Sequence, residues 1–404
     1  MRVVIAPDSF GGTLSAVEAA EAIAAGWTRA APSDEVLLLP LADGGSGFVS
    51  VLHAALGGRL HEVAVTGPVG GVEVTAHWLR VERDGRVTGY LEAAQACGLH
   101  LVGTPSPDTA RNATSRGVGE LVAAALAGDG DGGGGGRAEV ARQASGQAGA
   151  RGLDELVIGL GGSACTDGGA GALAALGAIP LDAEGRELPD GGAALAHVAA
   201  LAQPPRPPAG PVLVLAADVD NPLLGRHGAA SVYGPQKGAD PTVVAELEAA
   251  LTRWAGVLAA ATGRDPAELA GTPGAGASGG LGAALLALGA RRVSGAALVR
   301  ELAGLDAALD SCDLVITGEG SFDWQSLRGK LITAVSGAAA ERGLPCVVLA
   351  GQVEVGRREM GAVGVAEAHS VAEHAGGVRA ALADPAGTLA DLAASVADQW
   401  SGSR

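Results

Sequence analysis

The centre of the chain reads Leu156-Val-Ile-Gly-Leu-Gly-Gly-Ser-Ala-Cys-Thr-Asp-Gly-Gly169. Its apolar start predicts a buried strand, and the alanine-rich stretch after it predicts a helix that ends near Gly177. A glycine turn between a strand and a helix offers backbone N–H groups to an anion, because no Cβ keeps a phosphate away. The candidate anion-binding residues of this turn are Gly161, Gly162 and Ser163. Asp167 is a candidate metal ligand or proton acceptor, although an ordinary strand-to-helix turn would explain the same residues.

Length and composition limit the class of protein. A chain of 404 residues exceeds one typical core and predicts two domains. Hydrophobic residues make up 48% of the chain and aromatic residues only 2%, so we expect a core of Ala, Val and Leu. The net charge of −17 and the isoelectric point of about 4.8 argue against binding to nucleic acids or to anionic membranes.

The sequence carries no targeting or membrane signal that we can identify. No segment reaches the roughly 18–20 uninterrupted apolar residues of a membrane span, and the N-terminal residues lack the apolar region of a signal peptide. The four cysteines form no CxxC pair, and the eight histidines show no metal-ligand spacing. We therefore expect a reduced, cytoplasmic protein without structural zinc.

The N-terminal region repeats one pattern twice. A strand over Arg2–Pro7 and a strand over Glu35–Leu41, both expected to be covered on two faces, are each followed by an acid, glycines and a helix. Ligand sites of open parallel sheets collect at the carboxyl ends of strands. The candidate site residues here are Asp8, Ser9, Asp43, Gly44 and Gly45. Two capped helix starts would explain the same pattern.

The middle of the chain differs from both ends. His61–Thr66, Val72–Val81 and Arg86–Ala93 predict an antiparallel meander. Gly128–Gly152 is of low complexity and cannot bury enough apolar area to offset its ordering entropy, so we expect a disordered surface insert.

Acids also follow the apolar run Val212–Ala217. Asp218 and Asp220 are spaced so that they could share a Mg²⁺ ion, and a helix cap plus a turn explains them equally well. A second glycine-rich loop, Gly271–Gly282, precedes an Ala/Leu helix and contains Ser278 and Gly279.

Strands and helices alternate again from Leu288 onward. A strand over Asp313–Thr317 is followed by a predicted loop, Gly318-Glu-Gly-Ser-Phe-Asp323, and a final helix is expected over Asp384–Gln399. The sequence therefore predicts an α/β protein with a discontinuous parallel-sheet domain, residues 1–65 and 288–404. A mixed α/β domain, residues 66–287, is inserted into it.

Only two of the 27 basic residues are lysines, Lys237 and Lys330. Both lie beside glycine in loop-like stretches, whereas arginine is used everywhere else. A compact ammonium that a guanidinium cannot replace is the functional interpretation of this placement, and codon bias with chance placement is the alternative.

Seven blocks, in order along nearly the whole chain, resemble the bacterial glycerate kinases of the glycerate 2-kinase type. They are Ile5-Ala-Pro-Asp-Ser-Phe10, Leu41-Ala-Asp-Gly-Gly45, Gly159–Gly171, Asp218-Val-Asp-Asn-Pro-Leu-Leu-Gly225, Tyr233-Gly-Pro-Gln-Lys-Gly-Ala239, Gly274–Gly282 and Ile316–Lys330. The resemblance implies a two-domain enzyme whose discontinuous domain is flavodoxin-like. It also implies ATP-dependent phosphorylation of D-glycerate, with 2-phosphoglycerate as the expected product.

The resemblance and the chemistry together suggest roles. Phosphoryl transfer requires positioning and charge neutralisation. The candidate catalytic residues are Asp8, Asp43, Asp323 and Lys330, one of the acids taking the proton of the substrate hydroxyl. The candidate Mg²⁺ ligands are Asp167, Asp218 and Asp220. Further candidates for binding glycerate or ATP are Ser9, Gly44, Gly45, Asn221, Lys237, Ser278, Gly279, Glu319, Gln325 and Arg328.

Four positions depart from the family pattern. Gly11 stands where many members have Lys, Ser46 replaces a Glu, Phe48 a Thr and Thr166 an Asn, and Gly11 and Ser46 each lie in a candidate site loop. These departures leave two alternatives: a kinase for a related small hydroxy acid, or a non-catalytic ligand-binding or regulatory protein on the same scaffold. A nicotinamide-dependent dehydrogenase is disfavoured because no GxGxxG follows the first strand. The sequence does not predict an oligomeric state.

Overall fold

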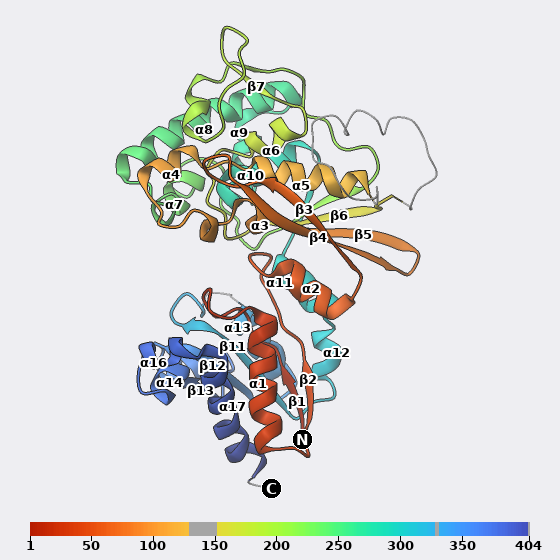
Figure 1. Ribbon diagram of the computed structural model, residues 1–404, viewed down its shortest axis with the longest axis vertical. Coiled ribbons are helices and arrows are strands. Elements are labelled where there is room, and N and C mark those ends of the chain that lie inside the picture. Colours follow the sequence, from red (N-terminus) through yellow and green to blue (C-terminus); the bar gives the residue numbers. More distant parts are fainter. Residues whose placement is uncertain (129–151, 328–330, 403–404) are drawn as a thin grey trace. The chain divides into compact units, whose positions relative to one another are not determined.

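The computed structural model describes residues 1–128, 152–327 and 331–402, which form two compact units (Figure 1). Unit 1 comprises Met1–Asp43, Ser50–Gly57 and Ala296–Arg404, and unit 2 comprises Gly44–Val49 and Gly58–Gly295. The sequence placed the junctions at residues 65–66 and 287–288. The segment expected to be a disordered insert, apart from its end residues 128 and 152, lies outside the described residues.

Unit 1 is built on a sheet of five parallel strands in the order β13-β12-β11-β1-β2. The strands are β1 (Arg2–Ile5), β2 (Glu35–Leu38), β11 (Leu314–Phe322), β12 (Cys346–Val353) and β13 (Glu367–Ser370). Numbered along the chain within this unit, the order is 2-1-3-4-5, which is the flavodoxin-like order. The predicted flavodoxin-like domain is therefore confirmed.

Helices cover both faces of this sheet. Helix α1 (Ala16–Ala30) begins at a capping box formed by Ser15 and Glu18, and α17 (Pro385–Ser401) begins after the N-cap Asp384. These two helices lie side by side and pack on one face of the sheet (Figure 1). Helix α13 (Leu331–Glu341) packs against the alternate residues of β12, because successive strand residues point to opposite faces.

The remaining helices of unit 1 are short. They are α2 (Phe48–Leu56), whose first two residues belong to unit 2, α11 (Gly295–Leu302), whose first residue also does, α12 (Leu305–Leu309), α14 (Arg357–Ala362), α15 (Val371–His374) and α16 (Val378–Ala383).

Two expectations for unit 1 are wrong. Strand β2 is not fully covered on both faces, because Glu35 is exposed and Leu38 is 38% exposed. Strand β11 does not end at Thr317 but continues to Phe322, because Ser321 and Phe322 still pair with β12. The glycines expected in a loop there lie in the strand, since the pairing of the ladder outweighs local glycine propensity.

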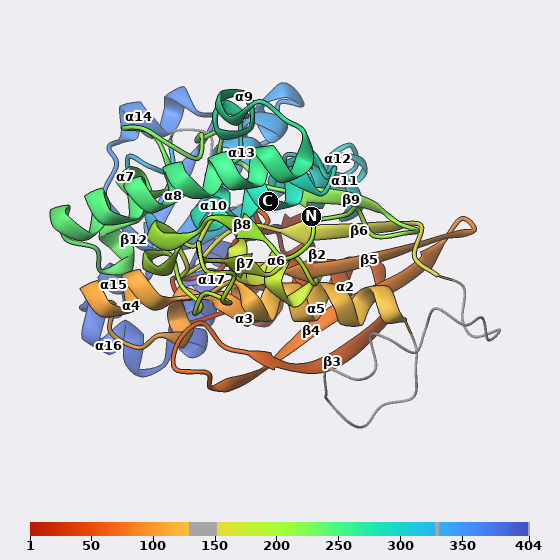
Figure 2. The ribbon, with the colours of Figure 1, turned by 90° about the horizontal axis from the view of Figure 1, so that it is seen from above.

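Unit 2 contains a sheet of six strands in the order β10-β9-β6-β5-β4-β3. The strands are β3 (Arg59–Thr66), β4 (Glu73–Arg83), β5 (Arg86–Glu92), β6 (Glu155–Gly159), β9 (Val212–Ala216) and β10 (Arg291–Val293). The first three form the predicted antiparallel meander, and β5, β6, β9 and β10 are parallel. Figure 2 shows β3, β4, β5 and β6 side by side. This mixed α/β unit was also predicted.

Helices pack on this sheet through one large core of Ala, Leu and Val side chains, as the composition predicts. They are α3 (Ala93–Cys97), α4 (Pro107–Asn112), α5 (Arg116–Ala127), α6 (Ala170–Ala175), α7 (Ala229–Tyr233), α8 (Pro241–Thr262), α9 (Pro266–Gly271) and α10 (Ala277–Ala287). A small hairpin joins β7 (Pro180–Leu181) and β8 (Ala200–Leu201). Of the helices in the described part of the chain, none has the length and apolar character needed to cross a membrane.

Candidate functional site

The strand order of the unit 1 sheet reverses between the neighbouring strands β1 and β11. Ligands of open α/β sheets bind outside the carboxyl ends of strands at such a point. Asp8 follows β1 there, and its backbone N–H donates a hydrogen bond of 2.8 Å to the carbonyl oxygen of Gly318 in β11. This bond places Asp8 beside the next residue of β11, Glu319. The two predicted site residues are thus brought together although they lie far apart in the sequence.

The carboxyl group of Asp8 is difficult to ionise. Burial, followed by the repulsion from Asp43 and then from Glu319, raises its pKa from 3.8 to about 7, while a hydrogen bond from the Ser9 N–H at 2.6 Å opposes the rise. A general base is most effective when its pKa lies near the working pH. Asp8 is therefore suited to accept a proton near neutrality, and Asp43 and Glu319 tune it.

Asp323 has a different setting. Its Oδ1 accepts hydrogen bonds from the backbone N–H groups of Gln325 at 2.7 Å and Ser326 at 3.3 Å, which closes the turn after β11. The geometry favours a turn-stabilising role for Asp323. The predicted site residues Arg328 and Lys330 lie outside the described residues.

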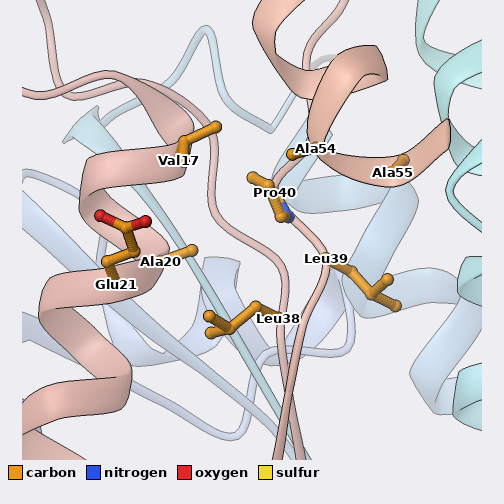
Figure 3. Close-up of a pocket in the computed structure, with 8 residues that line it drawn as sticks. All are labelled: Val17, Ala20, Glu21, Leu38, Leu39, Pro40, Ala54 and Ala55. Carbon is orange, nitrogen blue, oxygen red and sulfur yellow. The ribbon is translucent and has the colours of Figure 1, made fainter. Parts of the chain in front are cut away.

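An apolar groove of about 210 Å³ in unit 1 offers no cation to an anionic ligand (Figure 3). It is lined by Val17, Ala20, Glu21, Leu38, Leu39, Pro40, Ala54 and Ala55. Its only charged side chain is a carboxylate, so neither ATP nor a hydroxy acid suits it.

In unit 2 the segment Gly44–Val49 crosses the carboxyl ends of the parallel strands. A Cβ on Gly161, just after β6, would lie 2.6 Å from the Cα of Gly45, so the two backbones touch. A Cβ on Gly44 would lie 3.0 Å from the carbonyl oxygen of Ala216, the last residue of β9. Glycine is required for this approach. The glycines predicted near residues 44–45 and 161–162 therefore meet at one edge of the sheet.

Glu92, which the sequence analysis missed, holds this segment in place. Glu92 is the last residue of β5 and is only 4% exposed. Its carboxylate accepts hydrogen bonds from the N–H groups of Gly47 at 3.1 Å and Val49 at 2.9 Å. Burial raises the pKa of the Glu92 carboxyl, against the effect of these hydrogen bonds. A charged residue at the end of an otherwise apolar strand was the signal that could have identified it.

The loop after β6 contacts the predicted lysine of unit 2. Lys237 is 3% exposed, and its Nζ donates hydrogen bonds to the carbonyl oxygen of Cys165 at 2.6 Å and to Ser163 Oγ at 3.2 Å. Burial lowers the pKa of its ammonium group. A buried ammonium is costly unless an anion compensates it.

The second glycine-rich loop meets the same carbonyl group. A Cβ on Gly279 would lie 1.9 Å from the Cys165 oxygen, so the backbone at residues 278–279 lies against it. Ser278 has a φ of +49°, which is unfavourable for any residue with a Cβ. Its Oγ is buried and has no hydrogen-bond partner among the described residues. Such local strain is often found at ligand-binding sites.

The acids expected to bind metal have other partners. Asp167 is fully buried, and its carboxylate accepts four hydrogen bonds, which favours a structural role. Asp220 forms an ion pair with Arg292 at 2.6 Å. Asp218 is exposed and accepts a hydrogen bond of 2.5 Å from Ser294.

The side chain of the neighbouring Asn221 makes two hydrogen bonds. Its Oδ1 accepts one of 2.6 Å from the Tyr233 hydroxyl, and its Nδ2 donates one of 2.7 Å to the carbonyl oxygen of His227. Within the described residues, no three acidic, histidine or cysteine side chains are placed to hold a metal ion by themselves. Mg²⁺ bound with nucleotide phosphates needs only one or two protein carboxylates, so the donors present are compatible with it.

Known proteins resemble this chain over most of its length. A model of the glycerate kinase family matches residues 3–131 and 139–401. The glycerate 2-kinase of Escherichia coli (strain K12) is 39% identical over 356 residues, covering 87% of this chain and 86% of that protein. The glycerate kinase of Bacillus subtilis (strain 168) is 40% identical over 359 residues, covering 87% and 85%. A crystal structure described as glycerate kinase 2 from Salmonella typhimurium LT2 has a TM-score of 0.74 at 34% identity, covering 100% of this chain and 99% of that chain.

Proposed function

Because the chain belongs to the glycerate kinase family, and is a kinase by that membership, we propose that it phosphorylates D-glycerate with ATP to give 2-phosphoglycerate. Both substrates are anions, whereas the protein carries a net charge of −17. Binding must therefore depend on local donors and cations at the strand ends, not on overall attraction.

The observation that carries the proposal is the position and pKa of Asp8. It lies where the strand order of unit 1 reverses, and its pKa of about 7 lets a substantial fraction be ionised at neutral pH. In the proposed step the carboxylate takes the proton of the substrate hydroxyl as that oxygen attacks the γ-phosphorus of ATP. The bond from the γ-phosphorus to the bridging oxygen breaks, and ADP leaves.

Mg²⁺ would accompany the nucleotide phosphates and neutralise the charge that develops on them. Asp218 is the carboxylate that we propose for it. It is exposed just after β9, whereas Asp167 is enclosed among four hydrogen-bond donors. Burial, and then repulsion from Asp43 and Glu319, raises the pKa of Asp8 to about 7. A cation on Asp43 or Glu319 would cancel that repulsion, so we propose no metal contact for them.

A related small hydroxy acid is the second candidate acceptor. Ser46, which departs from the family pattern, is exposed on the segment that crosses β6. Its Oγ lies 2.9 Å from the point that a Cβ on Gly162 would occupy, and so it lies beside the candidate anion-binding turn. A hydroxyl there, in place of a carboxylate, changes what the segment can hydrogen-bond.

The direct test follows acceptor-dependent ADP release with Mg²⁺, ATP and a panel of small hydroxy acids that includes D-glycerate. NMR of the product then distinguishes 2- from 3-phosphoglycerate. We expect D-glycerate to give the highest kcat/KM and 2-phosphoglycerate as product. ATP binding without acceptor-dependent ADP release across the panel would instead support a non-catalytic binding or regulatory protein.

A further inference from the structure

We propose that Lys237, Ser163 and Ser278 form a metal-independent oxyanion-binding site at the carboxyl end of β6. The three residues are neighbours because Lys237 Nζ bonds to the Cys165 carbonyl oxygen and to Ser163 Oγ, and the Ser278–Gly279 backbone packs on the same carbonyl group. The proposal rests on the proposed function for its choice of ligands, and it names the protein groups that contact them.

The Lys237 ammonium lacks a counter-charge. No carboxylate in the described part of the chain forms an ion pair with it, and its two hydrogen bonds go to neutral acceptors. Asp167 acts on it only at longer range, and burial raises the pKa of Asp167. The other titratable groups that face it are the thiols of Cys97 and Cys165. An anion from outside the chain would supply the missing compensation.

The hydroxyl of Ser163 is held in an orientation that suits an anion. Its oxygen accepts a hydrogen bond from Lys237, so its own proton must point elsewhere. The side chain is only 6% exposed, and its hydroxyl donates to no acceptor among the described residues. An unused buried donor next to an ammonium requires an acceptor, and an anion beside Lys237 would supply one.

Ser278 adds a third donor. Its buried Oγ has no partner among the described residues, and neither has that of Thr166, which packs against Gly279. Glycine would adopt the φ of +49° at position 278 without strain. A serine that carries this strain and leaves its hydroxyl unused is explained by a bound ligand.

The side chains of Lys237, Ser163 and Ser278 each offer a proton, and the ligand must therefore be rich in acceptors. An oxyanion satisfies the site, and the proposed substrates contain two kinds, the phosphoryl groups of ATP and the carboxylate of glycerate. The site requires no metal because the ammonium itself supplies the positive charge.

The test uses the full-length protein labelled with ¹³C-lysine, in the presence of a metal chelator. Two lysines give two Cε signals, and Lys237→Met assigns them by removing one. The signal of Lys237 should titrate below the ordinary lysine pKa of 10.5, and it should move to higher pH when an anion binds. Inorganic phosphate, ADP and D-glycerate are added in separate titrations. A shift of the Lys237 signal with phosphate or ADP indicates a phosphoryl subsite, and a shift with D-glycerate indicates a carboxylate subsite.

Variants separate binding from stability. For the anion that shifts the Lys237 signal, Lys237→Met should weaken binding at least tenfold without lowering the Tm, because it removes an uncompensated buried charge. Ser163→Ala should weaken binding of the same anion about tenfold. Ser278→Ala and Ser278→Gly should both weaken its binding, and only the glycine variant should raise the Tm. The matched control is Ser336→Ala, which removes a buried hydroxyl in unit 1 that bonds to Val363 and should leave anion binding unchanged.

The proposed site is wrong if none of the three anions changes the titration of the Lys237 signal. It is also wrong if Lys237→Met leaves anion binding unaffected. If the protein still turns over glycerate in that case, the proposed function stands. Anion binding that depends on Lys237 in a protein without kinase activity has the opposite meaning: the site stands and the proposed function fails.

Discussion

The backbone N–H of Asp8 donates its hydrogen bond to the carbonyl oxygen of Gly318. This bond continues the parallel pairing of β1 with β11 beyond its last pair, Ile5 with Ile316. Backbone pairing therefore holds the Asp8 carboxyl beside Glu319. A change confined to the Asp8 side chain should leave its position intact, which makes substitutions there informative.

Asp8→Asn should lower kcat by about 10²–10⁴, the usual contribution of a general base. The amide has nearly the same shape as the carboxylate but cannot accept the substrate proton. Asp323→Asn is the matched control, because Asp323 closes a turn and should affect stability by about 1 kcal/mol with little change in kcat. Steady-state kinetics decide between them, and full turnover in Asp8→Asn would transfer the role of base to another acid.

The stability of Asp8→Asn should depend on pH. In the folded protein the pKa of Asp8 is raised from 3.8 to about 7, so its contribution to stability is fully present below pH 3.8 and is lost as the pH rises through about 7. The variant should therefore melt at a higher temperature than the wild type above pH 7, by roughly 2–4 °C for each kcal/mol gained, and at the same temperature near pH 3.8. Calorimetry of both proteins across this range measures the difference.

Asp43→Asn should shift the acid limb of the kcat/KM profile to lower pH. Repulsion from Asp43 raises the pKa of Asp8, and removing that charge removes part of the rise. A pH–rate profile of the variant measures the shift. An unchanged profile would mean that burial alone sets the pKa of Asp8 or that another group is the base.

Glu92→Gln should weaken substrate binding and lower stability by about 1–3 kcal/mol. Its NH₂ group cannot accept one of the N–H bonds that now come from Gly47 and Val49, so the segment across β6 loses part of its support. We expect KM to rise more than kcat falls. Glu73→Gln, an exposed carboxylate on β4, is the matched control and should change neither. A loss of stability without any change in KM would show that Glu92 only stabilises the fold.

Asp167→Asn should destabilise unit 2 by about 2–3 kcal/mol, since an amide faces four donors that a carboxylate now satisfies. The affinity for Mg²⁺-ATP should remain close to that of the wild type in the folded fraction. Thermal melts with and without Mg²⁺ test both points. A loss of Mg²⁺ affinity at unchanged Tm would restore Asp167 as a metal ligand.

Several elements could be predicted from local sequence alone. The capping box at Ser15, the proline after Asp384 and the alternation in β3–β5 act over a few residues, so they could be recognised without the fold. Strand β11 was placed too short because its last pairs depend on β12. Strand β2 was expected to be covered on both faces because apolar composition does not reveal which residues the helices leave exposed.

For the candidate site, the sequence by itself determined which residues were available: acids and glycines after strands, and two rare lysines. Only the tertiary structure decided how they are used. It brings Asp8 beside Glu319, encloses Asp167 among four donors, and surrounds Lys237 with neutral acceptors. The pKa and partners of a side chain depend on burial and on neighbours distant along the chain, and both exist only once the sheets have formed.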